Sequence, residues 1–212
     1  MSKAIDVLPN GFEPVAENAI RPASLPANSE DLPLLVFVGR LSEQKGLDVL
    51  MDAWDLLCKQ GEPKARLAIA GSGELNEWLE QRIASSTYPG SIAKLGRVED
   101  VEKRWLFEQA KGVLIPSRFE GLPTVLLEAM HAGAPTVMAD VNDLGRLVTE
   151  PNAGLSVAPG NSQDLLKAIN TLLKADGAQI KTWSENGHQA SKPYLWSNVV
   201  DDLLEVYKRV KT

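Results

Sequence analysis

The sequence predicts a doubly wound α/β domain built on a parallel sheet of six strands. Six short apolar runs recur along the chain, helical patterns separate most of them, and glycine-containing loops follow several runs. The chain has 212 residues, 44% of them hydrophobic and 24% charged, so a substantial core can form. We expect a Rossmann-like strand order of 3-2-1-4-5-6, with ligands bound at the carboxyl ends of the strands.

The expected elements alternate in the order that such a fold requires. The strands are expected at Leu34–Val38, Arg66–Ala70, Ile92–Leu95, Val113–Ile115, Thr136–Ala139 and Leu155–Val157. Helices are expected at Gly46–Lys59, Glu74–Ser85, Val101–Ala110 and Pro123–Ala132, the last with its proline near the first turn, where the missing N–H costs nothing. Three further helices, Ser162–Lys174, Ala178–Ala190 and Trp196–Val210, are expected on the flank of the sheet.

Residues 1–31 are predicted to be a linker and entry segment, and residues 32–212 to form the domain. Pro9-Asn10-Gly11 is a typical turn sequence. The segment then continues irregularly because prolines recur at Pro14, Pro22 and Pro26.

The composition argues against several classes of protein. A net charge of −6 argues against a nucleic-acid or anionic-membrane surface. A single cysteine, Cys58, cannot form an intrachain disulfide, and its helical context predicts a core position rather than a nucleophile. His131 and His188 are expected to be structural, and two histidines with one cysteine argue against a zinc site. No apolar stretch of about 20 residues and no signal-peptide core is present, which predicts a cytoplasmic location.

The loop Gly39–Gly46 is the first that suggests a ligand. It follows a strand, opens a helix and carries two cations, Arg40 and Lys45, between two glycines. Glycines let backbone N–H groups approach an anion, a helix N-terminus attracts it, and an arginine fork suits phosphate oxygens. The alternative is that both cations are solvated surface groups beside an ordinary strand-to-helix turn.

Two carboxylates, Glu120 and Glu128, mark the second loop. Eight helical residues would separate them by about 12 Å, which suits two parts of an extended polyol better than one shared atom. The turn Gly121-Leu122-Pro123-Thr124 directs the first N–H groups of the helix between them. Alternatively, Glu128 is a helix-surface residue and Glu120 only interacts with the helix dipole. A third loop, Gly71-Ser72-Gly73, is compatible equally with a ligand contact and with a tight turn.

In combination, these motifs resemble the family-4 retaining glycosyltransferases. The resemblance covers nearly the whole chain and rests on an ordered set: Gly39-Arg40-Leu41 with Lys45-Gly46, Ala70-Gly71-Ser72-Gly73, Leu95-Gly96-Arg97-Val98, and Pro116-Ser117-Arg118-Phe119-Glu120-Gly121-Leu122-Pro123. Glu120 and Glu128 match the E-x7-E signature of that family, Val7–Gly11 resembles its interdomain linker, and Tyr194-Leu195-Trp196 with Tyr207 resembles its closing helix.

The resemblance implies the C-terminal half of a GT-B fold that binds a nucleotide-diphosphate sugar, with a UDP-sugar favoured, and needs no bound metal or cofactor. Arg40 and Lys45 would hold the diphosphate and Glu128 the ribose. Glu120 and the backbone of Gly121, Leu122, Pro123 and Thr124 would hold the transferred sugar and its phosphate, and Arg97 and Val98 would lie against the base. Glu120, Arg40 and Lys45 would be the catalytic set. The acceptor would belong to an N-terminal domain, which would also make any peripheral contact with the inner membrane.

Two departures from the family pattern affect this interpretation. The family commonly has a glycine-glycine-x-proline-glutamate segment where this chain has Asn142-Asp143-Leu144-Gly145-Arg146, so that Arg146 takes the place of the glutamate. A different or weaker donor contact is expected there. The chain is also expected to begin at about the interdomain linker, without the acceptor domain, and to be inactive by itself.

Two other functions stay open at this point. The first is a nucleotide-sugar epimerase or a sugar phosphorylase on the same architecture, although no acid–base motif and no pyridoxal lysine was found for either. The second is a non-catalytic sugar-nucleotide-binding module, which the changed loop at Asn142–Arg146 would fit.

Overall fold

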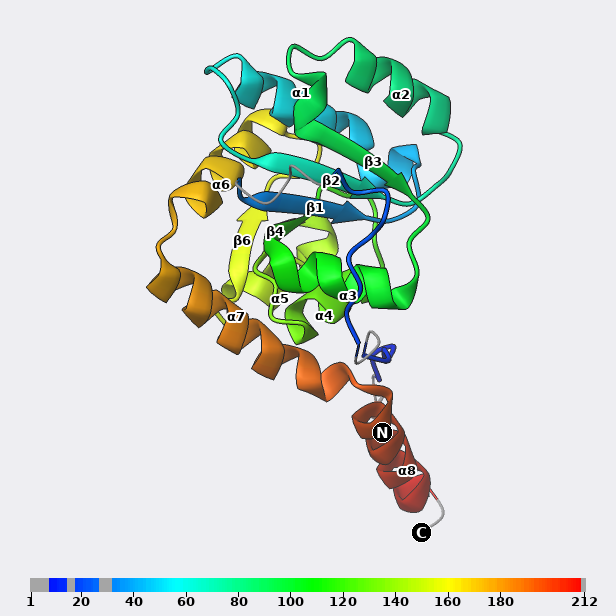
Figure 1. Ribbon diagram of the computed structural model, residues 1–212. Helices are drawn as coiled ribbons and strands as arrows, with labels where there is room; N and C mark the ends of the chain where they lie inside the picture. The colour runs from blue at the N-terminus through cyan, green and yellow to red at the C-terminus, as the bar shows by residue number, and fades with distance from the viewer. Residues whose placement is uncertain (1–7, 15–17, 27–31, 211–212) are drawn as a thin grey trace.

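The computed structural model describes residues 8–14, 18–26 and 32–210, and the rest of the predicted linker lies outside them (Figure 1). Six strands form one sheet in which every neighbouring pair is parallel. They are β1 Leu34–Val38, β2 Arg66–Ala70, β3 Ile92–Gly96, β4 Ala110–Ile115, β5 Thr136–Ala139 and β6 Gly154–Val157. Their order is β3-β2-β1-β4-β5-β6, which confirms the predicted topology.

Helices cover both faces of the sheet. One face packs against α1 Leu47–Cys58, α2 Asn76–Ala84 and α6 Ser162–Lys174, and the other against α3 Asp100–Gln109, α4 Thr124–His131 and α5 Arg146–Thr149. Along β1, Leu35 and Phe37 join the first core and Val36 the second, because successive side chains of a strand point to opposite faces. Helix α7 Gly177–Ser191 then packs against α4.

The lone cysteine lies in the core, as predicted. Cys58 is buried at the end of α1, and burial raises the pKa of its thiol, as expected of a packing residue. Trp54, one turn earlier, is fully buried, and its indole N–H donates to Ser91 Oγ at 3.0 Å. Burying such a side chain stabilises the fold by about 1.5–3 kcal/mol or more, which anchors α1 to the sheet.

Strand β4 begins three residues earlier than predicted. Helix α3 ends at Gln109, so that Ala110, predicted to be helical, already pairs with Leu34 of β1. Gly112 interrupts the apolar pattern here, and the glycine allows α6 to approach the strand closely. A Cβ atom on Gly112 would lie 2.3 Å from Leu172 Cδ2 of α6, so the absence of a side chain lets that helix pack directly on the sheet.

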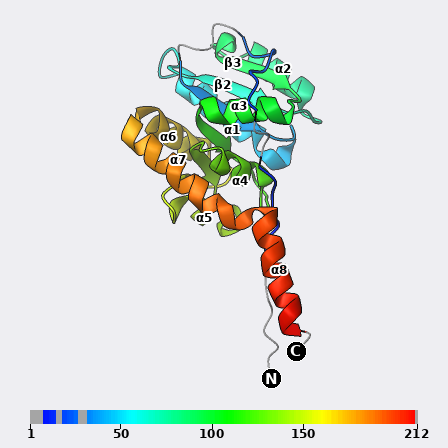
Figure 2. The same cartoon turned by 60° about the horizontal axis from the view of Figure 1, so that its bottom comes forward.

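Helix α8, Trp196–Val210, corrects the prediction of three flanking helices. Helices α6 and α7 pack on the domain, whereas α8 extends away from the sheet (Figures 1 and 2). Its Leu204 is 50% exposed and its Tyr207 58% exposed, although the pattern of α8 is amphipathic. Sequence periodicity identified the helix but could not show whether its apolar face has a partner.

The start of α8 is joined to the predicted linker. Phe12 is buried, and its N–H donates to Tyr194 O at 2.9 Å, while the N–H of Trp196 donates to Phe12 O at 3.1 Å. Gly11 lies against the Trp196 ring, where a Cβ atom would be 2.5 Å from Cδ2. The described parts of the two segments that resembled the family linker and closing helix are therefore side by side. In the described part of the chain, no helix is both long and apolar enough to cross a bilayer.

Protonation of His131 is expected to destabilise the fold. His131, the last residue of α4, packs against α7, with its ring centroid 4.7 Å from that of His188. Burial lowers the pKa of His131, and the positive potential of His188, Arg104 and Lys192 lowers it further. The unfolded chain therefore binds this proton more readily, so stability should fall as the pH drops below about 6.5.

Thermal unfolding at several pH values tests this expectation. His131→Gln should lose less in melting temperature between neutral pH and about pH 5 than the parent chain does. Parallel pH profiles for the two proteins would show that the burial of His131 does not contribute to the acid sensitivity.

Candidate functional site

The loops after β1, β2 and β3 enclose a depression at the carboxyl edge of the sheet. Its volume is about 290 Å³, and we refer to it as the cationic pocket. It is lined by Val38, Gly39, Arg40, Ala70, Gly71, Ser72, Arg97, Val98 and Lys103. This edge is where doubly wound sheets bind their ligands.

Three cations from three different elements meet in the cationic pocket. Arg40 and Arg97 are exposed and follow β1 and β3, and Lys103 belongs to the first turn of α3. Val98, which was predicted to contact the base, is half-buried and lines the same pocket. Arg40 thus lies in the same pocket as Arg97 and Val98, from which the sequence separates it by almost 60 positions. A pocket with this charge suits an anionic ligand.

Lys103 is the site residue that sequence reasoning missed. Its Nζ lies 3.0 Å from Glu128 Oε2 of α4 and 3.1 Å from Asp100 Oδ1. Burial lowers the pKa of Lys103, but the charges and hydrogen bonds of Glu128 and Asp100 outweigh it, so the pKa is raised and the amine stays charged. Only its position soon after the Gly96-Arg97-Val98 loop could have indicated this role.

Glu128 is held at the border of the cationic pocket by this ion pair. Its side chain is 16% exposed and that of Lys103 is 18% exposed, so the two charges are largely screened from water. Glu128 is therefore not the solvated helix-surface residue that was its alternative interpretation. The pair orients a carboxylate beside Lys103, one of the three cations of the pocket, where it can accept hydrogen bonds from ligand hydroxyls.

Glu120 is buried and fixed by three contacts. Its Oε1 accepts hydrogen bonds from Lys45 Nζ at 2.5 Å and from Ser117 Oγ at 2.7 Å, and its backbone O accepts one from Asn142 Nδ2 at 3.0 Å. Lys45 is not among the residues that line the cationic pocket, since its amine is directed to Glu120. The joint action of Arg40 and Lys45 on one diphosphate stays a prediction, and the Lys45 side chain passes close to Gly39 of the pocket, 3.9 Å from the position of a Cβ atom there.

The turn between Glu120 and α4 leaves backbone donors accessible. Pro123 is the N-cap of α4, and no side chain caps this helix among the residues that the structure describes. Gly121 is exposed, and a Cβ atom there would meet no atom within 4 Å, while Leu122 is half-buried and Thr124 exposed. The N-terminus of α4 can thus offer its first N–H groups and its dipole to an anion.

Close backbone contacts between loops explain the glycines of the motifs. Gly71 has φ +139°, and a Cβ atom there would lie 1.8 Å from Gly39 O. At Gly73 a Cβ atom would lie 2.3 Å from Leu41 O, and at Gly46, with φ +65°, 2.0 Å from Pro116 O. The Gly71-Ser72-Gly73 sequence is therefore required by packing, and Gly71 and Ser72 line the cationic pocket as well.

The loop that departs from the family pattern is tied to Glu120. Asn142 and Asp143 have φ values of 53° and 64°, a left-handed conformation that costs non-glycine residues energy. Asn142 nevertheless holds the Glu120 carbonyl from this conformation. Arg146 is exposed and pairs with Asp143 at 3.3 Å.

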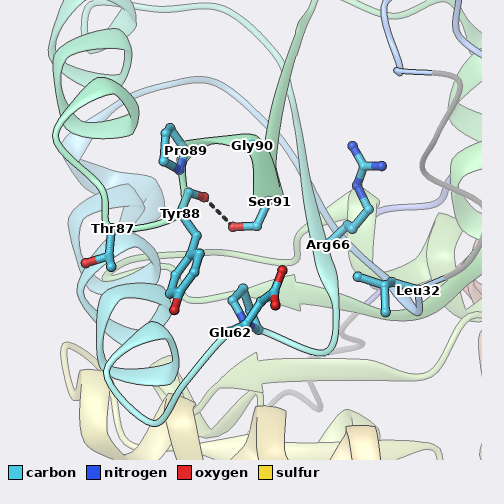
Figure 3. Close-up of a pocket in the computed structure, with 9 residues that line it drawn as sticks. Leu32, Glu62, Arg66, Thr87, Tyr88, Pro89, Gly90 and Ser91 are labelled. Atoms are coloured by element: carbon cyan, nitrogen blue, oxygen red, sulfur yellow. Dashed lines mark hydrogen bonds between the residues drawn. The ribbon is translucent and has the colours of Figure 1, made fainter.

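Another depression lies at the opposite edge of the sheet. It has a volume of about 340 Å³ and opens beside the amino ends of β2 and β3, where Glu62, Arg66 and Tyr88 surround it (Figure 3). The Ser91 hydroxyl donates to the Tyr88 carbonyl at 2.7 Å within it. Because the loops that lead from strands to helices are at the other edge, this depression is separate from the predicted site. No cluster of three or more histidine, cysteine or acidic side chains suited to a metal occurs within the described ranges.

The fold is similar to that of one half of solved GT-B glycosyltransferases. The sucrose-phosphate synthase of Thermosynechococcus elongatus aligns with a TM-score of 0.77 at 22% identity, over 96% of this chain and 52% of that chain. HepE of Anabaena, solved in complex with UDP-glucose, aligns with a TM-score of 0.73 at 26% identity, over 84% of this chain and 49% of that chain.

The chain belongs to the family of glycosyl transferases group 1, whose model matches residues 23–190. A glycosyltransferase of Methanocaldococcus jannaschii is 30% identical over 179 residues, which are 84% of this chain and 45% of that protein. The glycogen synthase of Mycobacterium tuberculosis is 28% identical over 211 residues, 98% of this chain and 49% of that protein. The chain thus spans about half the length of the curated relatives it matches.

Proposed function

We propose that the chain is the donor-binding half of a retaining glycosyltransferase that uses a nucleotide-diphosphate sugar. One observation carries the proposal: the cationic pocket at the carboxyl edge of the sheet holds three cations, and one of them, Lys103, orients the carboxylate of Glu128. The family to which the chain belongs is that of glycosyl transferases group 1. A diphosphate needs cations and a ribose needs hydroxyl acceptors, and this edge supplies both.

A UDP-sugar is the donor that we favour. The solved complex of HepE, which is 26% identical, contains UDP-glucose. In this chain the base would lie against Arg97 and Val98, the diphosphate would meet Arg40, and Glu128 would accept hydrogen bonds from the ribose. The pocket volume of about 290 Å³ is near the lower end of ordinary small-molecule sites, consistent with a ligand that extends beyond it toward Glu120.

The transferred sugar would lie at Glu120 and the start of α4. Lys45 has three N–H donors, of which Glu120 takes one, so the amine can bridge this carboxylate and the diphosphate. The backbone of Gly121, Leu122, Pro123 and Thr124 would complete the sugar and phosphate contacts.

Glu120, Arg40 and Lys45 would be the catalytic set of a reaction that needs no metal. As the bond from the sugar to the diphosphate breaks, negative charge develops on the leaving diphosphate. Arg40, Lys45 and the N-terminus of α4 would stabilise that charge, and Lys103 adds a further cation nearby. Transfer with retention of configuration is part of the proposal.

The acceptor would be held by an N-terminal domain of the same enzyme. We propose a cytoplasmic protein that contacts no nucleic acid, and whose membrane contact, if the full-length enzyme makes one, is a peripheral contact of the N-terminal domain with the inner membrane. A non-catalytic sugar-nucleotide-binding module is the second candidate. It is favoured by the changed loop, where Arg146 pairs with Asp143 instead of offering a carboxylate.

The 212-residue chain is expected to bind UDP but to transfer no sugar, because transfer requires donor and acceptor to be held together. Isothermal titration measures the binding of UDP. An assay with UDP-glucose measures hydrolysis and sugar transfer. Arg40→Ala should weaken UDP by about tenfold or more. Lys181→Ala, at an exposed cation of α7, should leave the affinity unchanged.

Either of two results would contradict the proposal. Absence of UDP binding by the parent chain would remove the donor site, and transfer by this chain without a partner would show that it is not half of an enzyme. Fusing the chain to the N-terminal half of a relative and repeating the assay with EDTA then separates an enzyme from a binding module and tests metal independence.

A further inference from the structure

A second depression lies beside the donor edge, and we call it the side pocket. Its volume is about 580 Å³, compared with about 290 Å³ for the cationic pocket. It is lined by Glu43, Gln44, Asp48, Leu75, Trp78 and Arg118. These residues come from the start of α1 and the short helix Glu43–Lys45 before it, from α2 and its approach, and from the loop after β4. None of them lines the cationic pocket.

One wall of the side pocket is apolar and firmly anchored. Leu75 and Trp78 are half-buried and pack against the core that α1 forms with the sheet. Each therefore keeps part of its side chain at the surface of the depression while the rest is fixed. An anchored indole with an accessible part combines an apolar surface with a polar N–H, a combination suited to ligands that have both C–H faces and hydroxyls.

The opposite wall is polar and preorganised. The Arg118 guanidinium donates two hydrogen bonds to the Asp48 carboxylate and a third to Glu43 O at 3.2 Å. The Arg118 N–H donates to Gln44 O at 2.8 Å, and Gln44 Nε2 donates to Phe119 O at 3.0 Å. Hydrogen bonds from Arg118 hold the pKa of Asp48 below its usual value despite burial, so this carboxylate remains a charged acceptor.

The charge of the side pocket discriminates against phosphates. Two carboxylates, Glu43 and Asp48, face one guanidinium, Arg118, whose charge Asp48 already neutralises. An anion would meet the second carboxylate without a free cation from these six residues, whereas hydroxyl groups would find acceptors. The side pocket therefore differs chemically from the cationic pocket.

We propose that the side pocket is a binding site for a neutral sugar ring, which lies on Trp78 and donates its hydroxyls to Glu43 and Asp48. The wall formed by Gln44 and Arg118 is continuous with the donor site, because Lys45 follows Gln44 and pairs with Glu120, two residues after Arg118. An occupant would thus adjoin the sugar-binding loop and belong to the acceptor glycan, as a contact additional to those that the proposed N-terminal domain makes with it. Its assignment to the acceptor rests on the proposed function, whereas sugar binding at this site does not.

Nuclear magnetic resonance of the 212-residue chain tests the proposal directly. Maltotriose, cellotriose and triacetylchitotriose are the neutral probes, and glucose 1-phosphate is the anionic one. At least one trisaccharide should shift the indole N–H signal of Trp78, assigned through its loss in Trp78→Phe, with a dissociation constant on the order of 1 mM. Trp78→Ala should weaken that trisaccharide by about tenfold and Glu43→Gln by severalfold.

Two controls separate this site from the donor site and from loss of folding. Trp196→Ala, which removes a 42% exposed tryptophan of α8, should bind the trisaccharide like the parent chain. Trp78→Ala should retain the UDP affinity of the parent, which also shows that it is folded. If UDP does not bind to either protein, the donor function fails while sugar binding can still be scored from the Trp78 signal.

The proposal is overturned if none of the neutral trisaccharides shifts the Trp78 signal at about 20 mM, well above the expected dissociation constant. It is also overturned if glucose 1-phosphate binds more tightly than the neutral probes, or if a bound trisaccharide keeps its affinity in Trp78→Ala.

Discussion

Replacing Glu128 with alanine is expected to weaken UDP and a UDP-sugar by the same factor, about tenfold or more. The carboxylate would accept two charge-assisted hydrogen bonds from the ribose, each contributing about 1.5–3 kcal/mol, and both ligands carry that ribose. Lys103 holds Glu128 in place, so Lys103→Ala should also weaken the binding of both ligands. In Glu128→Ala, Lys103 keeps Asp100 as an ion-pair partner. Isothermal titration of UDP and UDP-glucose measures the two factors.

A matched control distinguishes this role from the general loss of an ion pair. Glu80 of α2 pairs with Lys94 of β3 at 2.6 Å and is not a lining residue of the cationic pocket. Glu80→Ala should change either affinity by less than about 0.5 kcal/mol, the usual range for surface substitutions. If Glu128→Ala behaves like Glu80→Ala, then Glu128 is only a partner of Lys103 and does not bind the ribose.

Replacing Glu120 is expected to separate the two ligands. Glu120→Ala should weaken UDP-glucose by about tenfold or more and leave UDP nearly unchanged, because only the intact donor carries the sugar that this carboxylate would hold. Glu120→Gln preserves the volume of the side chain and an acceptor for Ser117 Oγ, so it gives the same comparison with less disturbance of the loop. The measurement is the ratio of the two affinities for each variant.

Lys45→Ala tests the other member of the Lys45–Glu120 ion pair. It removes the cation of Glu120 as well as the proposed diphosphate contact, so UDP should weaken, and the melting temperature should fall because a buried carboxylate loses its partner. Equal effects of Glu120→Ala on UDP and UDP-glucose would contradict the sugar-binding role, even though the fold and the pocket are as described.

Much of the fold could be predicted because it depends on local patterns. The apolar runs located all six strands, and the Rossmann-like class that their alternation with helices indicates supplied the strand order. The errors arose where a residue's role depends on another element. Gly112 weakened the apolar pattern of its strand because α6 packs on it, and α8 has a helical pattern whether or not its apolar face is covered.

The site was predictable to the extent that motifs lie in loops after strands. Arg40 was identified in this way and Arg97 and Val98 through the family resemblance, and the three residues share one pocket. Pairings over long sequence distances could not be seen: Lys45 and Glu120 are 75 positions apart, and Lys103 reaches Glu128 from another helix. The position of Lys103 soon after the Gly96-Arg97-Val98 loop is the one hint in the sequence, and its contact with Glu128 is visible only in the three-dimensional structure.

The contact between the loops after β1 and β2 limits how the cationic pocket can diversify. Because the two backbones already touch at Gly71 and Gly39, inserting a residue into either loop would displace the other, and a larger residue at Gly71 has no room. Related proteins can therefore change the selectivity of this pocket by exchanging side chains such as those of Ser72 and Arg97, rather than by lengthening its loops. Directed evolution of this site should accordingly recover point substitutions at lining positions and reject insertions between β1 and α1 or between β2 and α2.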